Sequence, residues 1–243
     1  MIKKYTTNDE LENLCDALIQ DYMKVRHYTN SHCLDIEDFV VDYLGLPIVY
    51  EKLAEEDHGK IGYISDGIRK LKVWRNKNIK EIIYPKDTIV LDVFLNRSEE
   101  IGRKRFTIAH EAAHYVLNKH IPLQLSVSTG FRSEYDGSMV YRPEAIKDML
   151  SLSEMLANRA GACLIMARFL VLRVLKRYNN QQKIIAYDGY VLSQDQKIII
   201  QRMADALGVN YSACFNRLKE LNLFEIRPIE EYLTSFKSGG DIA

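Results

Sequence analysis

Apolar residues in the first part of the chain recur every three or four positions, the spacing of one face of an α-helix. Thr7 is a suitable N-cap and is followed three residues later by Glu10, which is the pattern of a capping box. A second helix is predicted after Asp35 and should end at Gly45, shortly before a proline. The chain is therefore expected to begin with two helices.

From Leu46 to Leu95 the pattern changes to short β-rich runs separated by turn residues. The predicted strands are Pro47–Lys52, Lys60–Ile64, Leu71–Arg75, Glu81–Tyr84 and Thr88–Leu95. The turn-forming triplet Pro85-Lys86-Asp87 predicts a hairpin between the last two strands. The run Val90–Leu95 is apolar on both faces, so this strand should be covered on both sides.

A cluster of basic residues surrounds Trp74. Its members are Arg69, Lys70, Lys72, Arg75, Lys77 and Lys80. Charges on a solvated strand edge commonly prevent unwanted pairing with another edge, and this is the preferred interpretation. The alternative is a patch that binds an acidic partner.

The most informative stretch is Phe106–Leu117, which combines an apolar helical pattern with His110, Glu111 and His114. In this H-E-x-x-H motif the two histidines are four residues apart and share one helix face, where both imidazoles can bind one metal ion. Glu111 lies beside the first ligand and can take a proton from water activated by the metal. Burial of a helix explains the apolar residues but not two histidines and a carboxylate, because charged groups are rarely buried unpaired. The motif therefore predicts a metallohydrolase.

The helix that carries this motif is predicted to run from Ser98, a favourable N-cap, to about Lys119. The polar segment Ile121–Leu150 follows it and is either a substrate-binding lid or an ordinary insertion. Four side chains in or beside this segment are candidates for stabilising an oxyanion, and the sequence does not select among them. They are His120, Arg132, Tyr135 and Tyr141.

A zinc hydrolase of this kind needs a third protein ligand and leaves its fourth position to water. Glu154 is the candidate, because it is an acid at the head of the otherwise apolar stretch Ser151–Leu175. The alternative is that Glu154 only stabilises the first turn of its helix through the dipole. Asn158, one turn later, is a candidate to accept the remaining ring N–H of His110 or His114, and packing or capping is its alternative role.

The segment Asp195–Phe224 has the pattern of a helix, a tight turn at Gly208 and a second helix. A DNA-binding helix-turn-helix would place Tyr211–Leu218 in a major groove. However, Asp195–Ala243 carries six Lys or Arg and seven Asp or Glu, and phosphate neutralisation supplies most DNA affinity. A structural or partner-docking helix pair is therefore preferred, with direct DNA binding as the alternative.

The composition is that of a globular protein, because 47% of the 243 residues are hydrophobic and 27% are charged. The formal net charge of zero gives no general argument for a nucleic-acid or membrane partner. The four cysteines lack C-x-x-C spacing, and the sequence shows neither a signal peptide nor an apolar run of about 18 residues. We therefore expect a cytoplasmic protein without disulfides.

Three blocks, in this order, resemble the ImmA/IrrE family of bacterial and phage metallo-endopeptidases. The first is the strand Ile89–Leu95 followed by a basic segment and the metal helix at Arg103–His114. The second is E-x-x-A-N at Glu154–Asn158, followed by small and apolar residues. The third is the helix-turn-helix-like close at Leu207–Leu221. Together the blocks cover roughly Thr88–Leu223, and all three in sequence are fairly specific.

The resemblance implies an α+β, gluzincin-like fold with a small mixed or antiparallel sheet beside a long active-site helix. It implies His110, His114 and Glu154 as zinc ligands, with manganese as another metal that such a site admits, and Glu111 as the catalytic acid/base. Family members typically cleave a helix-turn-helix transcriptional repressor, so a repressor is the expected protein substrate.

On these grounds we expect a zincin-like domain over residues 1–183, a helical part with the helix-turn-helix-like pair over 184–234 and a disordered tail over 235–243. The expected activity is hydrolysis of a peptide bond in a protein substrate. The alternative is a regulatory protein that binds DNA or a protein partner without cutting it.

Overall fold

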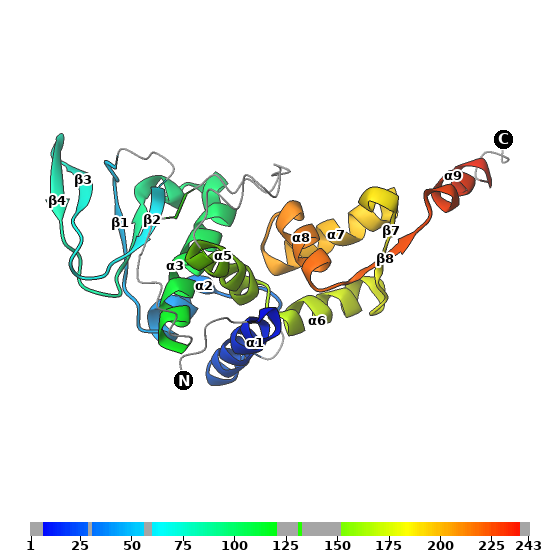
Figure 1. Cartoon of the computed structure of the whole chain (residues 1–243), viewed down its shortest axis with the longest axis horizontal. Helices are drawn as coiled ribbons and strands as arrows, with labels where there is room; N and C mark the ends of the chain where they lie inside the picture. Colours follow the sequence, from blue (N-terminus) through cyan, green and yellow to red (C-terminus); the bar gives the residue numbers. More distant parts are fainter. Residues whose placement is uncertain (1–6, 29–30, 56–59, 121–130, 133–151, 239–243) are drawn as a thin grey trace. The chain divides into compact units, whose positions relative to one another are not determined.

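The structure, a computed structural model, describes residues 7–28, 31–55, 60–120, 131–132 and 152–238 (Figure 1). By their internal contacts the residues form two compact units, 1–167 and 168–243. Helices and small sheets are mixed along the chain, so the predicted α+β class is confirmed. The three-part division predicted from the sequence stays a prediction.

The first helix of the N-terminal unit, α1 (Asn8–Val25), begins at the predicted capping box. The Thr7 hydroxyl accepts a hydrogen bond from the backbone N–H of Glu10 (3.2 Å), and the Glu10 carboxylate accepts one from the backbone N–H of Thr7 (3.0 Å). The buried positions of α1 recur at helical spacing and include Leu11, Cys15, Ile19 and Tyr22. This face contacts helix α5 (Leu152–Ile165).

The second predicted helix is present in a modified form. Helix α2 (Ile36–Asp38) starts after Asp35, whose carboxylate accepts a hydrogen bond from the backbone N–H of Asp38 (3.1 Å). The chain continues as a π-helix, η1 (Phe39–Tyr43), and turns away at Gly45, where a φ of +75° suits glycine. The π-helical turn was not predicted, because the spacing of apolar residues does not distinguish it from an α-helical turn.

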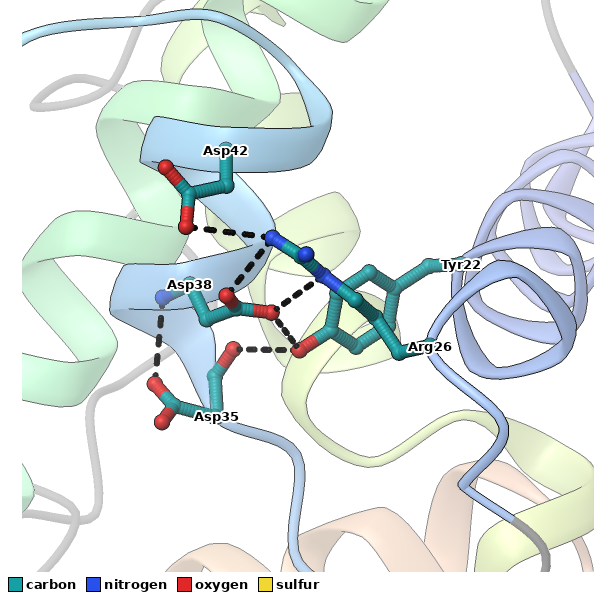
Figure 2. A network of polar contacts seen from close by, with 5 residues as sticks. All are labelled: Tyr22, Arg26, Asp35, Asp38 and Asp42. Carbon is teal, nitrogen blue, oxygen red and sulfur yellow. Dashed lines mark hydrogen bonds and ion pairs between the residues drawn. The ribbon is translucent and has the colours of Figure 1, made fainter.

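A polar network ties the end of α1 to this segment (Figure 2). The Asp38 carboxylate accepts hydrogen bonds from the Tyr22 hydroxyl (2.6 Å) and from Nε and Nη2 of Arg26 (3.0 and 2.8 Å). Arg26 also pairs with Asp42 at 3.1 Å. The ring of Tyr22 is fully buried and meets that of Phe39 edge-on. The network therefore fixes one helical segment against the other within the N-terminal unit.

The main sheet of this unit has the strand order β1-β5-β2-β6. Its strands are β1 (Ile48–Glu51), β5 (Ile89–Asp92), β2 (Lys60–Ile64) and β6 (Phe131–Arg132). Strand β5 pairs in parallel with β1 and antiparallel with β2, and Ile89, Val90 and Leu91 are fully buried. The predicted cover on both faces thus holds for the first part of the run Val90–Leu95, whereas Val93 is exposed. The strand ends earlier than predicted because the Asp92 carboxylate accepts a hydrogen bond from the backbone N–H of Phe94 (3.0 Å) and starts a 3-10 turn.

A separate two-stranded hairpin consists of β3 (Leu71–Arg75) and β4 (Asn78–Ile82). Asn76 and Lys77, both with positive φ, form its turn. The hairpin predicted at Pro85–Asp87 is wrong, because the strand that follows this triplet is β5, which pairs with β1 and β2. The triplet does turn the chain, but it leads from the hairpin into the main sheet.

The helix with the H-E-x-x-H motif is α3 (Ile101–His120), which contacts β2 on one side and α5 on another. Ser98 does not cap this helix as predicted. A 3-10 turn, η3 (Ser98–Glu100), precedes α3, and the Ser98 hydroxyl donates to the Glu99 carboxylate (3.2 Å).

Helix α5 approaches α3 very closely at Gly161. A Cβ atom at this glycine would lie 3.1 Å from the backbone nitrogen of His110, 3.2 Å from its Cα and 3.3 Å from the carbonyl carbon of Ala109. Ala109, Ala112 and Ala113 of α3 are also fully buried. Small residues thus allow the backbones of the two helices to come together at the metal-binding motif.

The C-terminal unit contains the predicted helix-turn-helix-like pair, α7 (Gln194–Leu207) and α8 (Tyr211–Glu220). Gly208 ends α7 in the left-handed conformation (φ +66°), and the Asn210 side chain caps α8 by accepting from the backbone N–H of Ala213 (2.7 Å). The other elements are α6 (Arg168–Asn179), the parallel strands β7 (Ile184–Tyr187) and β8 (Phe224–Arg227), and α9 (Ile229–Ser238). Helix α9 thus extends into the segment for which a disordered tail was predicted.

Within the described part of the chain, no single helix has both the length and the hydropathy needed to cross a membrane. The four cysteines, Cys15, Cys33, Cys163 and Cys214, are free thiols.

The network around Asp38 predicts an acid-dependent contribution to stability. The hydrogen bond from Tyr22 and the charge of Arg26 hold the pKa of Asp38 below its ordinary value, against the effect of burial. A lowered pKa in the folded state means that the contribution is complete above the unfolded-state pKa of about 3.9 and is lost as the pH falls through the lower folded-state value. Asp38→Asn should therefore lower the free energy of unfolding by about 1–3 kcal/mol at pH 7.

The measurement is urea unfolding of both proteins between neutral and acid pH. The difference between them should shrink as the pH falls below about 4. A difference of the same size at both ends of the range would contradict this role for Asp38.

The close approach at Gly161 predicts that a single methyl group there is harmful. Gly161→Ala should lower the free energy of unfolding by about 1–3 kcal/mol, because the atoms that the methyl group would meet are backbone atoms of α3. Gly102→Ala is the matched control, since Gly102 also lies in a helix but has no atom within 4 Å of the added Cβ. The control should be neutral or stabilising by up to about 1 kcal/mol. Equal stability of the two variants would disprove the tight packing.

Candidate metal centre

Helix α3 places three polar side chains of the motif in the interior. His110, Glu111 and His114 are 0%, 1% and 5% exposed. The Nε2 atoms of the two imidazoles lie 3.2 Å apart, and the rings meet edge-to-face with centroids separated by 4.8 Å. The helical spacing therefore brings both ring nitrogens to one point, as the sequence predicted.

Helix α5 brings Glu154 to the same point. One carboxylate oxygen of Glu154 lies 3.3 Å from Nε2 of His110, and the other lies 3.6 Å from Nε2 of His114. Glu154 is 7% exposed, so a carboxylate and two imidazoles meet inside the N-terminal unit. These three are the residues predicted to hold the metal.

The geometry of this cluster fits a tetrahedral metal ion. Ligand atoms about 2.0–2.1 Å from a zinc ion in tetrahedral directions lie about 3.4 Å from one another. The two Nε2 atoms, 3.2 Å apart, and the contact of 3.3 Å between Nε2 of His110 and one oxygen of Glu154 are close to that value, whereas the contact of 3.6 Å to His114 is made by the other oxygen of Glu154. Among the described residues, His110, His114 and Glu154 form the one group whose ligand atoms come together in this way, all within 4.8 Å.

The charges of the site also favour a cation. Burial alone would lower the pKa of His114, but its hydrogen bond to Glu154 and the charges of Glu111 and Glu154 outweigh burial and raise it. Burial raises the pKa of Glu111, although both neighbouring imidazoles oppose this. The two buried carboxylates, Glu111 and Glu154, therefore attract positive charge. A divalent metal ion neutralises both negative charges, whereas one proton neutralises only one.

The carboxylate of Glu111 is held between α3 and β2. The backbone N–H of Ile64 in β2 donates a hydrogen bond to it, which opposes the rise in pKa caused by burial. The Oε1 atom is buried and has no hydrogen-bond partner within the described residues. Strand β2 therefore orients the carboxylate, and Oε1 is available to accept a proton.

Two glycines that shape the site were not singled out from the sequence. A Cβ at Gly62 in β2 would collide with Thr107 Cγ2 and lie 3.1 Å from Oε1 of Glu111, so glycine lets the strand lie against the Glu111 carboxylate. Gly161 lets α5 lie against His110. The signals were a lone glycine inside a predicted strand and the run of small residues Ala160–Ala162, both typical of close backbone approach.

The remaining predicted site residues gain no role from the structure. The Oδ1 atom of Asn158 is buried and has no hydrogen-bond partner among the described residues, so a bond from either imidazole is not formed. Its role beside the metal ligands stays a prediction. Of the oxyanion candidates, His120 is the exposed last residue of α3, whereas Tyr135, Tyr141 and the side chain of Arg132 lie outside the described residues. The predicted lid also lies outside them, apart from the two residues of β6.

Comparison with known proteins identifies the family. No curated protein matches the chain. The family model of peptidase M78, described as the IrrE N-terminal-like domain, matches residues 41–219. The matched region contains all three residues of the metal cluster and Glu111, and it confirms the resemblance noted from the sequence motifs. The chain therefore belongs to the peptidase M78 family of IrrE N-terminal-like domains.

Proposed function

We propose that the chain is a zinc-dependent endopeptidase that hydrolyses a peptide bond in a protein substrate. Membership of a peptidase family and the His110–His114–Glu154 cluster together support a metallopeptidase. The observation that carries the proposal is the approach of Glu154 to both imidazoles beside the buried carboxylate of Glu111. Zinc is preferred because two histidines and one glutamate are a common ligand set of zinc hydrolases, and manganese is the alternative.

The chemistry of the proposed reaction is divided between the metal and Glu111. A metal ion held by His110, His114 and Glu154 would act as a Lewis acid and lower the pKa of water from about 15.7 to about 7. Oε1 of Glu111 accepts a proton from the attacking water while the Ile64 N–H keeps the carboxylate oriented. The water oxygen forms a bond with the carbonyl carbon, the C–N bond breaks, and Glu111 passes its proton to the leaving amine.

The proposed protein substrate is a helix-turn-helix transcriptional repressor, because the chain resembles the ImmA/IrrE peptidases, which typically cleave such proteins. An extended segment of the substrate can add to a free edge of the main sheet, where backbone hydrogen bonds hold it. The α7–α8 pair is proposed as a structural or partner-docking unit. The free thiols favour the reducing cytoplasm as the location.

The ligand role of Glu154 is tested by the metal content of the purified protein. Wild type should contain about one zinc ion per chain, and Glu154→Ala should lose it, because two imidazoles alone leave the site incomplete. Met155→Ala is the control, since Met155 is the next residue of α5 but is exposed, and it should retain the metal. Zinc retained by Glu154→Ala would exclude Glu154 as a ligand. No zinc in any of the proteins, even after addition, would favour a non-proteolytic binding protein.

The role of Glu111 as general base predicts a different result. Glu111→Gln should retain zinc but lower the rate of repressor cleavage by about 10²–10⁴-fold, because the amide cannot accept the proton. Glu99→Gln makes the same chemical change at an exposed position just before α3 and should leave the rate unchanged. The rate is measured by gel electrophoresis of candidate repressors incubated with each protein. Cleavage by Glu111→Gln at the wild-type rate would rule out this mechanism.

A further inference from the structure

The hairpin β3–β4 exposes an apolar surface on the face that points away from the domain. In the strand register Trp74 lies opposite Ile79, and both side chains are on the outer face, 41% and 51% exposed. Ile83 follows Ile79 by an even number of residues and is also 51% exposed. The opposite face carries Leu71 and Val73, which are buried in the core. Figure 1 shows the hairpin beyond β1 and β2, with β4 outermost.

Cations outnumber acids around this apolar surface. Residues 69–81 contain six Lys or Arg and one Glu, whereas the whole chain is formally neutral. The ammonium of Lys52 lies over the Trp74 ring at 5.9 Å, and Lys72 is on the same face of β3. Glu81 lies opposite Lys72 on this face and pairs with Lys70 at 3.1 Å. Lys80 lies opposite Val73 and so belongs to the other face. Lys77, in the turn, is exposed and forms no ion pair within the described part of the chain.

The turn of the hairpin carries a lysine where glycine would be more stable. Asn76 and Lys77 have φ values of +51° and +64°, the conformation of a two-residue type I′ turn. Asparagine followed by glycine is the favoured pair for such a turn, because a side chain in the left-handed conformation costs about 1–2 kcal/mol. Lys77 thus occupies a turn position at which glycine would be more stable.

Protection of a strand edge does not account for these features. Lysines at an edge do prevent pairing with another strand. An exposed tryptophan and two exposed isoleucines have the opposite effect, because apolar side chains on an open hairpin promote association. A small apolar centre that includes tryptophan, bordered by polar side chains, is instead the arrangement of a protein-binding surface.

We infer that the outer face of the β3–β4 hairpin is a docking surface for an acidic protein segment with exposed apolar side chains. Its aspartates and glutamates would pair with Lys72 and Lys77, and its apolar side chains would cover Trp74 and Ile79. A nucleic acid would also be attracted by the lysines and can stack on a tryptophan. A nucleic acid has no aliphatic side chains that could pack on the exposed isoleucines, so a protein segment is the better partner. If the peptidase activity proposed above is correct, the protein substrate is the natural carrier of this segment.

Binding at this surface can be followed by the intrinsic fluorescence of Trp74. Trp74 is the only tryptophan among the 243 residues, so tryptophan fluorescence reports the outer face of the hairpin alone. The probe is a synthetic peptide without tryptophan, in which aspartate and glutamate alternate with leucine and phenylalanine. It is titrated into the zinc-loaded full chain with Glu111→Gln, which should not cut it. Binding does not require catalysis, so failure here is distinct from failure of the proposed activity.

The expected result is a saturable blue shift of the Trp74 emission that weakens with added salt. A peptide with glutamine and asparagine in place of the acids should bind on the order of tenfold more weakly. In the protein, Lys72→Glu with Lys77→Glu should weaken binding by on the order of tenfold, and Ile79→Ser should also weaken it. The control is Lys183→Glu with Lys197→Glu, which makes the same charge change at exposed positions outside the hairpin and should retain most of the affinity.

Lys77→Gly separates binding from folding. It should raise the melting temperature, because glycine suits the left-handed turn, and at the same time weaken peptide binding. The inference is overturned if the emission does not change, if the uncharged peptide binds equally well, or if the control reversal weakens binding as much as the hairpin reversal. It is also overturned if a single-stranded or duplex DNA oligonucleotide binds more tightly than the acidic peptide, which would make the surface a nucleic-acid site.

Discussion

The contact between α5 and α3 at Gly161 is the constraint on which the metal centre depends. The two imidazoles are placed by one helix, but the third ligand comes from another helix, so the set is complete only if the two backbones approach closely. The absence of a side chain at Gly161 permits this approach. On the other side of α3, Gly62 lets β2 reach Glu111 in the same way. Small residues thus bring three separate segments of chain to one buried, polar point.

Local patterns in the sequence were sufficient for the elements that a single stretch determines. The H-E-x-x-H spacing predicted which face of α3 holds His110, Glu111 and His114, because helical geometry fixes the relation between residues four apart. The capping box of α1 and the α7–α8 pair were predicted for the same reason. Glu154 lies 40 residues beyond His114, and the sequence alone left a helix-dipole role open for it. The family resemblance implied that Glu154 is a metal ligand, and the structure places its carboxylate beside both imidazoles.

Features that depend on competition between distant segments were not predictable in this way. The Pro85–Asp87 turn favoured a hairpin locally, but β5 pairs with β1 and β2 instead. No local pattern in the sequence shows these partners. Asn76 and Lys77 lack the usual glycine of a tight hairpin, so that turn was not recognised. Ser98 is a good N-cap by type, yet a 3-10 turn precedes α3. The closeness of the helices at Gly161 depends on tertiary packing, which the sequence indicates only through its small residues.

The central claim is that His110, His114 and Glu154 together bind one metal ion inside the N-terminal unit. X-ray absorption spectroscopy of the zinc-loaded protein tests it most directly, because the method identifies the ligand atoms. The expected first shell contains only nitrogen and oxygen at about 2.0–2.2 Å, with the outer scattering of two imidazoles. A sulfur ligand at about 2.3 Å, or scattering from fewer than two imidazoles, would place the metal elsewhere and contradict the account.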